Sequence, residues 1–183
     1  GENISYTVLD RPSSVEVLRE IPNHHLIHFS CHGSSNSIDP SSSSLKLFSN
    51  PEDDVQSHSS LTVRDLSAID HDQAQIAYLS ACSTAENSSD ELLDEIIHVA
   101  SAFQLAGFPH VVGTLWEISD RATVPVTRLF YKALGERLMD AGGFRDGDAA
   151  YALHEALQTH RKSVKVMKGK DVLSWAPFIY MGG

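Results

Sequence analysis

The chain contains few cysteines and few basic residues, and each shortage excludes a class of protein. Only two cysteines, Cys31 and Cys82, occur among its 183 residues. Two cysteines are too few for the disulfide framework of a small secreted domain, so we expect a reduced, cytoplasmic setting. Lys and Arg total 14 against 24 Asp and Glu, which gives a formal net charge of −10. Because no basic stripe is present, nucleic acid is not an expected partner.

Long apolar runs and several familiar motifs are absent too. No stretch approaches the roughly 18 consecutive apolar residues of a membrane-spanning helix, so we expect no membrane partner. The chain has no G-x-S-x-G nucleophile elbow, which removes the usual serine-hydrolase alternative. It has no Gly-rich phosphate-binding loop and no internal repeat, and we expect no cofactor.

The histidines do not form a metal-binding pattern. His24, His25 and His28 cluster, and the first and last of these would share one face of a helix. That segment has the pattern of a strand, however, on which four residues span about 13 Å, too far for two bonds to one zinc ion. We therefore predict no metal site.

Strand-like and helix-like stretches alternate along the chain, which predicts an α/β fold with a mostly parallel central sheet flanked by helices. With 42% hydrophobic residues, the chain can form the core of a single domain over residues 1–183. The predicted strands are 6–9, 25–31, 45–48, 75–81, 110–116 and 176–182. The predicted helices are 12–21, 62–69, 94–107, one beginning near 120, and 148–160. Turn residues predict loops over 33–44, 49–60 and 83–93, and strand 25–31 is expected to be buried on both faces.

Three predicted strands end next to residues with reactive or ionisable side chains. These are His32 and Gly33 after strand 25–31, Cys82 after strand 75–81, and Trp116, Glu117 and Asp120 at the end of strand 110–116. In open α/β sheets, ligands bind beyond the carboxyl ends of the strands. The sequence therefore predicts a site at that edge.

Cys82 and His32 suit a nucleophile and its base. A free thiol is mostly protonated at neutral pH, so a nucleophilic cysteine needs a base, most often histidine. If the two strands are parallel neighbours, both side chains lie at the same rim, where the N–H groups of Gly33 and Cys82 could stabilise an oxyanion. Neighbours in a strand face opposite ways, so Cys31 is expected to point into the core, and a Cys31–Cys82 disulfide is not expected.

Acidic residues near the same rim favour a basic residue at the P1 position of a substrate. Glu117 and Asp120 follow the third strand, and Asp39 lies on an adjoining loop. Carboxylates there would attract Lys or Arg by charge complementarity. Asp120 also suits a helix N-cap, and Trp116 is expected either to pack in the core or to form one wall of the cleft.

An ordered set of motifs resembles the CHAT domain, a caspase-like module found with tetratricopeptide repeats. The motifs are His32-Gly33, 61-LTVRDL-66, 79-LSACST-84, Asp94-Glu95, 102-AFQLAGFPHVVGTLWEISD-120, Phe130-Tyr131 and 175-WAPFIYMG-182. The resemblance extends along nearly the whole chain, and the segment 100–120 is most similar to versions from filamentous fungi.

The resemblance implies a caspase-hemoglobinase fold and a Cys/His dyad that cleaves peptide bonds. Carried over by position, Cys82 is the nucleophile, His32 is the general base and then the acid, and Gly33 and Cys82 supply the oxyanion N–H groups. The resemblance also implies an upstream repeat or sensor region, with residues 1–183 as the C-terminal part of a longer protein in cell-death or defence signalling. Two alternatives remain open: a catalytically silent scaffold that binds protein partners, and another acyl-transfer enzyme with the same dyad.

Overall fold

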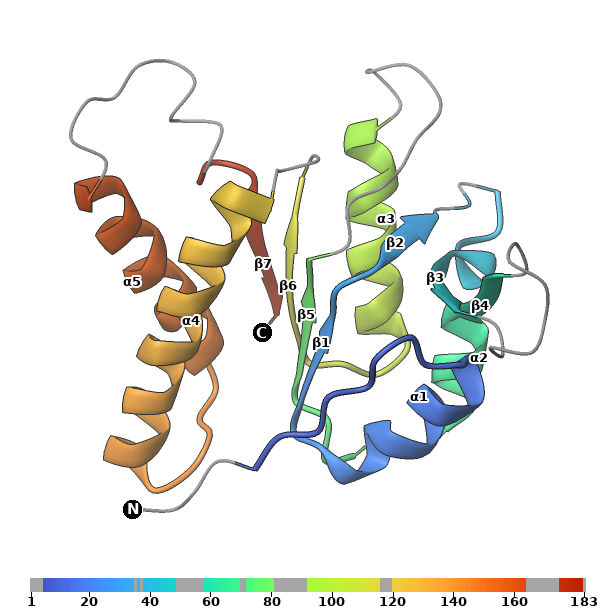
Figure 1. The fold of residues 1–183 in the computed structure, drawn as a ribbon, viewed down its shortest axis with the longest axis horizontal. Helices are drawn as coiled ribbons and strands as arrows, with labels where there is room; N and C mark the ends of the chain where they lie inside the picture. Colours follow the sequence, from blue (N-terminus) through green and yellow to red (C-terminus); the bar gives the residue numbers. More distant parts are fainter. Residues whose placement is uncertain are drawn as a thin grey trace.

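The computed structural model describes residues 5–34, 36, 38–48, 58–69, 72–80, 92–115, 120–163 and 175–182. Within these ranges, only the backbone is described for residues 58, 59, 92–98 and 120–122. The central sheet has four strands in the order β1-β5-β6-β7 (Figure 1). The strands are β1 (Leu26–Phe29), β5 (Ile76–Leu79), β6 (His110–Thr114) and β7 (Phe178–Gly182). The first three are parallel and β7 is antiparallel to β6, which confirms the predicted α/β fold with a mostly parallel central sheet.

Helices cover both faces of this sheet. In Figure 1, α4 (Asp120–Ala141) and α5 (Asp148–Ser163) lie on one side of the sheet, and α1 (Ser14–Glu20) and α3 (Leu92–Leu105) lie on the other. Because successive strand residues face opposite ways, β5 and β6 contribute to two cores. Ala77, Leu79 and Val111 pack with α1 and α3, whereas Ile76, Tyr78 and Val112 pack with α4 and α5.

Two of the predicted strands differ from the structure, and two are found as predicted. β5 and β6 have neighbours on both sides and are buried throughout, as their apolar sequences predict. β1 is an edge strand in which His28 is exposed, so the expectation that it is buried on both faces is wrong. Residues 6–9 do not form a strand; Tyr6 and Val8 remain 83% and 75% exposed, because no layer covers them.

A second sheet lies beside the carboxyl end of β1. It has the order β2-β3-β4, is antiparallel, and consists of β2 (His32–Ser34), β3 (Ser44–Phe48) and β4 (His58–Thr62). Only β3 matches a predicted strand, so the predicted loops over 33–44 and 49–60 are wrong where β2 and β4 form. Serine has a low strand propensity, but Leu45, Leu47 and Leu61 bury one face of this sheet against the α1 and α3 core and hold it in place.

Local signals that the sequence predicts set the start of α2 and the end of α3. The predicted N-cap Thr62 accepts a hydrogen bond from the Asp65 N–H and forms a capping box with it, at the start of α2 (Val63–Ser67). Gly107 has a φ of 113° just beyond α3, in the left-handed region that favours glycine, and ends that helix. Two 3₁₀ turns, η1 (Ile21–Asn23) and η2 (Pro40–Ser42), complete the elements. Among the described residues, no helix combines the length and hydrophobicity needed to cross a membrane.

Candidate active site

The carboxyl ends of β1 and β5 lie side by side. Phe29 and Leu79 are registered partners, and the N–H of Ser80 donates to the Phe29 carbonyl at 3.0 Å. The condition on which the predicted dyad depends, that these two strands are parallel neighbours, is therefore met. His32 and Cys82 each follow this registered pair by the same number of positions, three (32 − 29 and 82 − 79).

His32 and Gly33 are the first two residues of β2, the strand that continues from β1 into the second sheet (Figure 1). His32 is exposed and is registered with Lys46 of β3, while Gly33 is registered with Leu45. Cys82, the other member of the predicted dyad, lies outside the described residues. Trp116 and Glu117 also lie outside the described residues.

Cys31 has the surroundings of a structural cysteine. It is half-buried and packs against the core formed with α1 and α3, whereas the neighbouring His32 is exposed. Burial raises the pKa of the Cys31 thiol to about 11. Because the thiolate is the nucleophilic form, Cys31 is unreactive at neutral pH. The prediction that Cys31 belongs to the core is confirmed.

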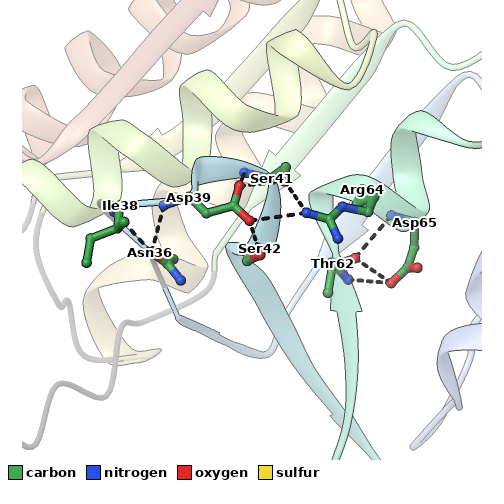
Figure 2. Close-up of polar contacts among 8 residues, drawn as sticks. All are labelled: Asn36, Ile38, Asp39, Ser41, Ser42, Thr62, Arg64 and Asp65. Carbon is green, nitrogen blue, oxygen red and sulfur yellow. Dashed lines mark hydrogen bonds and ion pairs between the residues drawn. The ribbon is translucent and has the colours of Figure 1, made fainter.

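Asp39 is engaged by groups of its own chain (Figure 2). It caps η2, and its carboxylate accepts hydrogen bonds from the Ser41 N–H at 3.1 Å and from the Ser41 and Ser42 hydroxyls at 2.6 and 2.5 Å. The Arg64 guanidinium donates to its Oδ2 at 3.1 Å. The Ser41 and Ser42 hydroxyls, and then Arg64, hold the pKa of Asp39 below its usual value. Asp120, another predicted pocket residue, is the first residue of α4.

A hydrogen-bonded group that the sequence did not predict lies at the same rim. His28 Nε2 lies 2.8 Å from Ser80 Oγ, and the Tyr131 hydroxyl of α4 lies 2.9 Å from His28 Nδ1. The ring of His28 is 4.7 Å from that of Tyr78 and 5.8 Å from that of Tyr131. Although the residue keeps an exposed edge, burial of its ring lowers the pKa of His28 to about 4.

These residues could be linked only once the strand register was known. His28 is registered with Tyr78. Ser80 lies two residues beyond Tyr78, just after β5, so the strand alternation places both side chains on the same face of the sheet. In the sequence, Ser80 is visible only as part of 79-LSACST-84, and His28 only as a candidate metal ligand. Among the described residues there is no group of three or more His, Cys, Asp or Glu side chains that could hold a metal ion.

Comparison with protein families matches residues 3–183 to the CHAT domain. No curated protein matches the chain. The family match extends over all but the first two of the 183 residues and agrees with the helix-flanked, mostly parallel sheet. The chain therefore belongs to the CHAT domain family and has its caspase-like peptidase fold.

Proposed function

We propose that this CHAT domain is a cysteine endopeptidase in which Cys82 is the nucleophile and His32 its base. One observation carries the proposal: β1 and β5 are adjacent, parallel and registered at Phe29 and Leu79. The segments that hold His32 and Cys82 therefore start from the same rim, at equal distances along the chain from a registered pair. This rim is where α/β sheets bind their ligands.

The reaction follows from the chemistry of a thiol and an imidazole. His32 takes the proton of the Cys82 thiol, and the sulfur attacks the carbonyl carbon of the scissile peptide bond. The N–H groups of Gly33 and Cys82 stabilise the tetrahedral oxyanion. His32 then protonates the leaving amine, and water hydrolyses the acyl-enzyme to release the second product and regenerate the thiol.

The two cysteines differ in ways that support this assignment. Cys31 packs against the core, and burial raises its pKa to about 11, so the unreactive thiol form predominates at neutral pH. His32 is exposed at the start of β2, unlike the neighbouring Cys31. Cys82 is then the one cysteine left to act as the nucleophile.

The P1 preference is proposed to be basic. Glu117 and Asp120 follow β6, the strand next to β5, and would bring negative charge to the pocket. Asp39 contributes less, because its carboxylate is already paired with Arg64. Trp116 is proposed as a wall of the cleft. By the family resemblance, the physiological role is regulated proteolysis in cell-death or defence signalling under an upstream sensor region.

Thiol alkylation at pH 6 tests the dyad. We expect Cys82 to react rapidly with iodoacetamide, and His32→Ala to slow that reaction markedly, because the imidazole no longer takes the thiol proton. Cys31 provides an internal control, since its raised pKa keeps it slow in both proteins. Equal, slow labelling of Cys82 in both proteins would support the catalytically silent scaffold instead.

A randomised peptide library tests the activity itself. We expect the wild-type domain to cleave after Lys or Arg and Cys82→Ala to have no activity, with Cys31→Ala as the matched control that keeps it. Cleavage that is unchanged in Cys82→Ala would remove Cys82 from the mechanism. Transfer products in place of free carboxylates would support an acyl-transfer enzyme.

A further inference from the structure

A continuous chain of hydrogen bonds joins three elements at the carboxyl rim. His28 of β1 lies between Ser80, which follows β5, and Tyr131 of α4, at 2.8 and 2.9 Å. Ser80 Oγ lies 3.3 Å from the carbonyl oxygen of Phe29, the last residue of β1. The chain therefore starts on a helix, passes through the edge strand and ends on the backbone where that strand stops.

One direction of donation makes all three hydrogen bonds of this network. The Tyr131 hydroxyl donates to Nδ1 of His28, Nε2–H donates to Ser80 Oγ, and the Ser80 hydroxyl donates to the Phe29 carbonyl. In the opposite direction, His28 would donate to Tyr131 and Ser80 would donate to Nε2 of His28, so the hydrogen bond from Ser80 to the Phe29 carbonyl would be lost. The arrangement that keeps all three hydrogen bonds has His28 as the Nε2–H tautomer, with both ring nitrogens occupied.

Tyr131, at the α4 end of this hydrogen-bonded network, is held by packing and by a neighbouring hydrogen bond. Tyr131 follows Phe130, which is fully buried in the α4 and α5 core, and its ring lies 5.8 Å from that of Tyr78. The Tyr78 hydroxyl lies 2.9 Å from Thr127 Oγ1 on the same helix. Side chains locked in this way give His28 a fixed point against which to hold Ser80.

We propose, on the basis of the peptidase function proposed above, that His28 is a positioning residue that acts through Ser80 on the nucleophile. The Phe29 carbonyl accepts both the Ser80 N–H at 3.0 Å and the Ser80 hydroxyl at 3.3 Å, so Ser80 is tied to β1 by its backbone and its side chain. Ser80 precedes Cys82 by two residues, and Phe29 precedes His32 by three. Fixing Ser80 against Phe29 therefore fixes the starting points of both segments of the dyad.

Histidine suits this position because it donates and accepts through one rigid ring. Burial of the ring lowers the pKa of His28 to about 4, so the ring stays neutral and Nδ1 remains an acceptor at physiological pH. His28 does not itself serve as the base, since both nitrogens are already bonded. Its effect on the reaction is geometric, and misplacement of reacting groups by about 1 Å can cost up to about a hundredfold in rate.

The experiment compares variants that remove a hydrogen bond between His28 and its partners with variants that keep it. We expect His28→Leu and Ser80→Ala to lower kcat by about tenfold to a hundredfold with KM little changed, because the proposed role of both residues is to position the dyad and not to bind the substrate. The pH profile of Cys82 alkylation should shift to higher pH, because a looser dyad stabilises the thiolate less. Ser80→Thr keeps the hydroxyl, and His28→Gln keeps a donor for Ser80; both should recover most of kcat.

Val126→Ala is the matched structural control. Val126 lies on α4, is fully buried in the same core and has no part in the hydrogen-bonded chain. At a comparable loss of thermal stability, it should leave kcat and the alkylation profile unchanged. A fall in kcat as large as that of Ser80→Ala, or a Ser80→Ala protein with wild-type kcat, would overturn the positioning role.

A spectroscopic measurement separates this inference from the proposed function. Long-range ¹H–¹⁵N spectra should identify His28 as the Nε2–H tautomer in the wild type, and Tyr131→Phe should change the Nδ1 signal. The Nδ1–H tautomer in the wild type would refute the direction of the chain whatever the activity. A wild-type domain that has the Nε2–H tautomer but shows neither cleavage nor rapid alkylation would refute the peptidase function. The positioning role of His28 would then fail with it.

Discussion

Two histidines of the central sheet, His28 and His110, lie at its opposite ends in contrasting surroundings. His28 is on the edge strand near the carboxyl rim, keeps an exposed edge and has a partner on each ring nitrogen. His110 begins β6, is only 2% exposed, and bonds Tyr180 through Nδ1 at 2.8 Å. Its Nε2 is buried and has no hydrogen-bond partner among the described residues.

The difference shows that burial alone does not identify a functional histidine. A buried polar atom without a partner costs free energy, so His110 is a stability liability packed between Phe144 and Tyr180. His28 instead links the ends of two strands that lead into the candidate dyad. Partners that connect separate elements at the ligand-binding edge are the better sign of function.

The same substitution at these two histidines should lower activity at His28 and leave it unchanged at His110. His28→Leu should lower kcat for peptide cleavage by about tenfold or more, whereas His110→Leu should leave kcat unchanged. The reason is position: His110 lies at the amino end of β6, at the far end of the sheet from the rim. Parallel steady-state assays of the two variants check this, and an equal loss of kcat in both would make the contrast one of stability alone.

Two glycines of the sheet should differ in their tolerance of a methyl group. A Cβ on Gly182 would lie 2.4 Å from the Tyr180 hydroxyl oxygen and 2.9 Å from His110 Nδ1, so the hydrogen bond between these residues must shift. On Gly113 of β6, it would meet Leu79 at an ordinary 3.9 Å. We expect Gly182→Ala to lower the free energy of unfolding by about 1–3 kcal/mol.

Urea denaturation of both glycine variants measures this difference, with Gly113→Ala expected to lie within about 0.5 kcal/mol of the wild type. Unfolding at the wild-type urea midpoint for Gly182→Ala would mean that the ring pair around His110 is loosely held. The His110 and His28 sites would then differ in how tightly their side chains pack, and not only in their hydrogen bonds.

Much of the fold could be predicted from local patterns. The apolar runs 75–81 and 110–116 predict strands, and β5 and β6 form within them and are buried throughout. The short, mostly polar strands β2 and β4 were missed because their pairing with β3, and not their own composition, stabilises them. Residues 6–9 were predicted as a strand, but they form none, and Tyr6 and Val8 remain exposed.

The candidate site divides in the same way. Cys82 and His32 could be named from the strand ends that precede them, and the pairing of those strands is confirmed. The proposed positioning role of His28 could not be predicted from the sequence. It depends on the β1–β5 register and on Tyr131, which is 103 residues away in the sequence. Likewise, no local pattern pairs Asp39 with Arg64, which lies 25 residues further along the chain.

Both histidines should make stability depend on pH in the same direction. Burial lowers the pKa of His28 to about 4 and also lowers that of His110, against the opposing charge of Asp146. A histidine with a lowered pKa in the fold binds its proton more readily when unfolded. Its contribution is therefore fully present above about pH 6.5 and is lost as the pH falls towards the folded-state value.

Chemical denaturation between pH 7.5 and pH 5, above the range in which the capping carboxylates Asp39 and Asp148 titrate, isolates this effect. His28→Gln should flatten the profile, by less than the limit of about 1.4 kcal/mol per pH unit for one proton, because its ring keeps an exposed edge. His154→Gln, on the exposed face of α5, is the matched control for replacing a histidine with glutamine away from the rim. A wild-type slope in His28→Gln would contradict the neutral, enclosed ring.

Removing both partners of each histidine pair gives the smallest and most discriminating effect. His110→Leu/Tyr180→Phe deletes a hydrogen bond together with an unsatisfied buried nitrogen, so the free energy of unfolding should stay within about 0.5 kcal/mol of the wild type or rise. His28→Leu/Tyr131→Phe deletes satisfied bonds and leaves Ser80 without its donor, so a loss of about 1–2 kcal/mol is expected. Urea titrations of the double variants and their component singles measure both couplings. If the His110 pair proved the more costly to remove, its Nε2 would have to be satisfied in solution, and the distinction between the two ends of the sheet would fail.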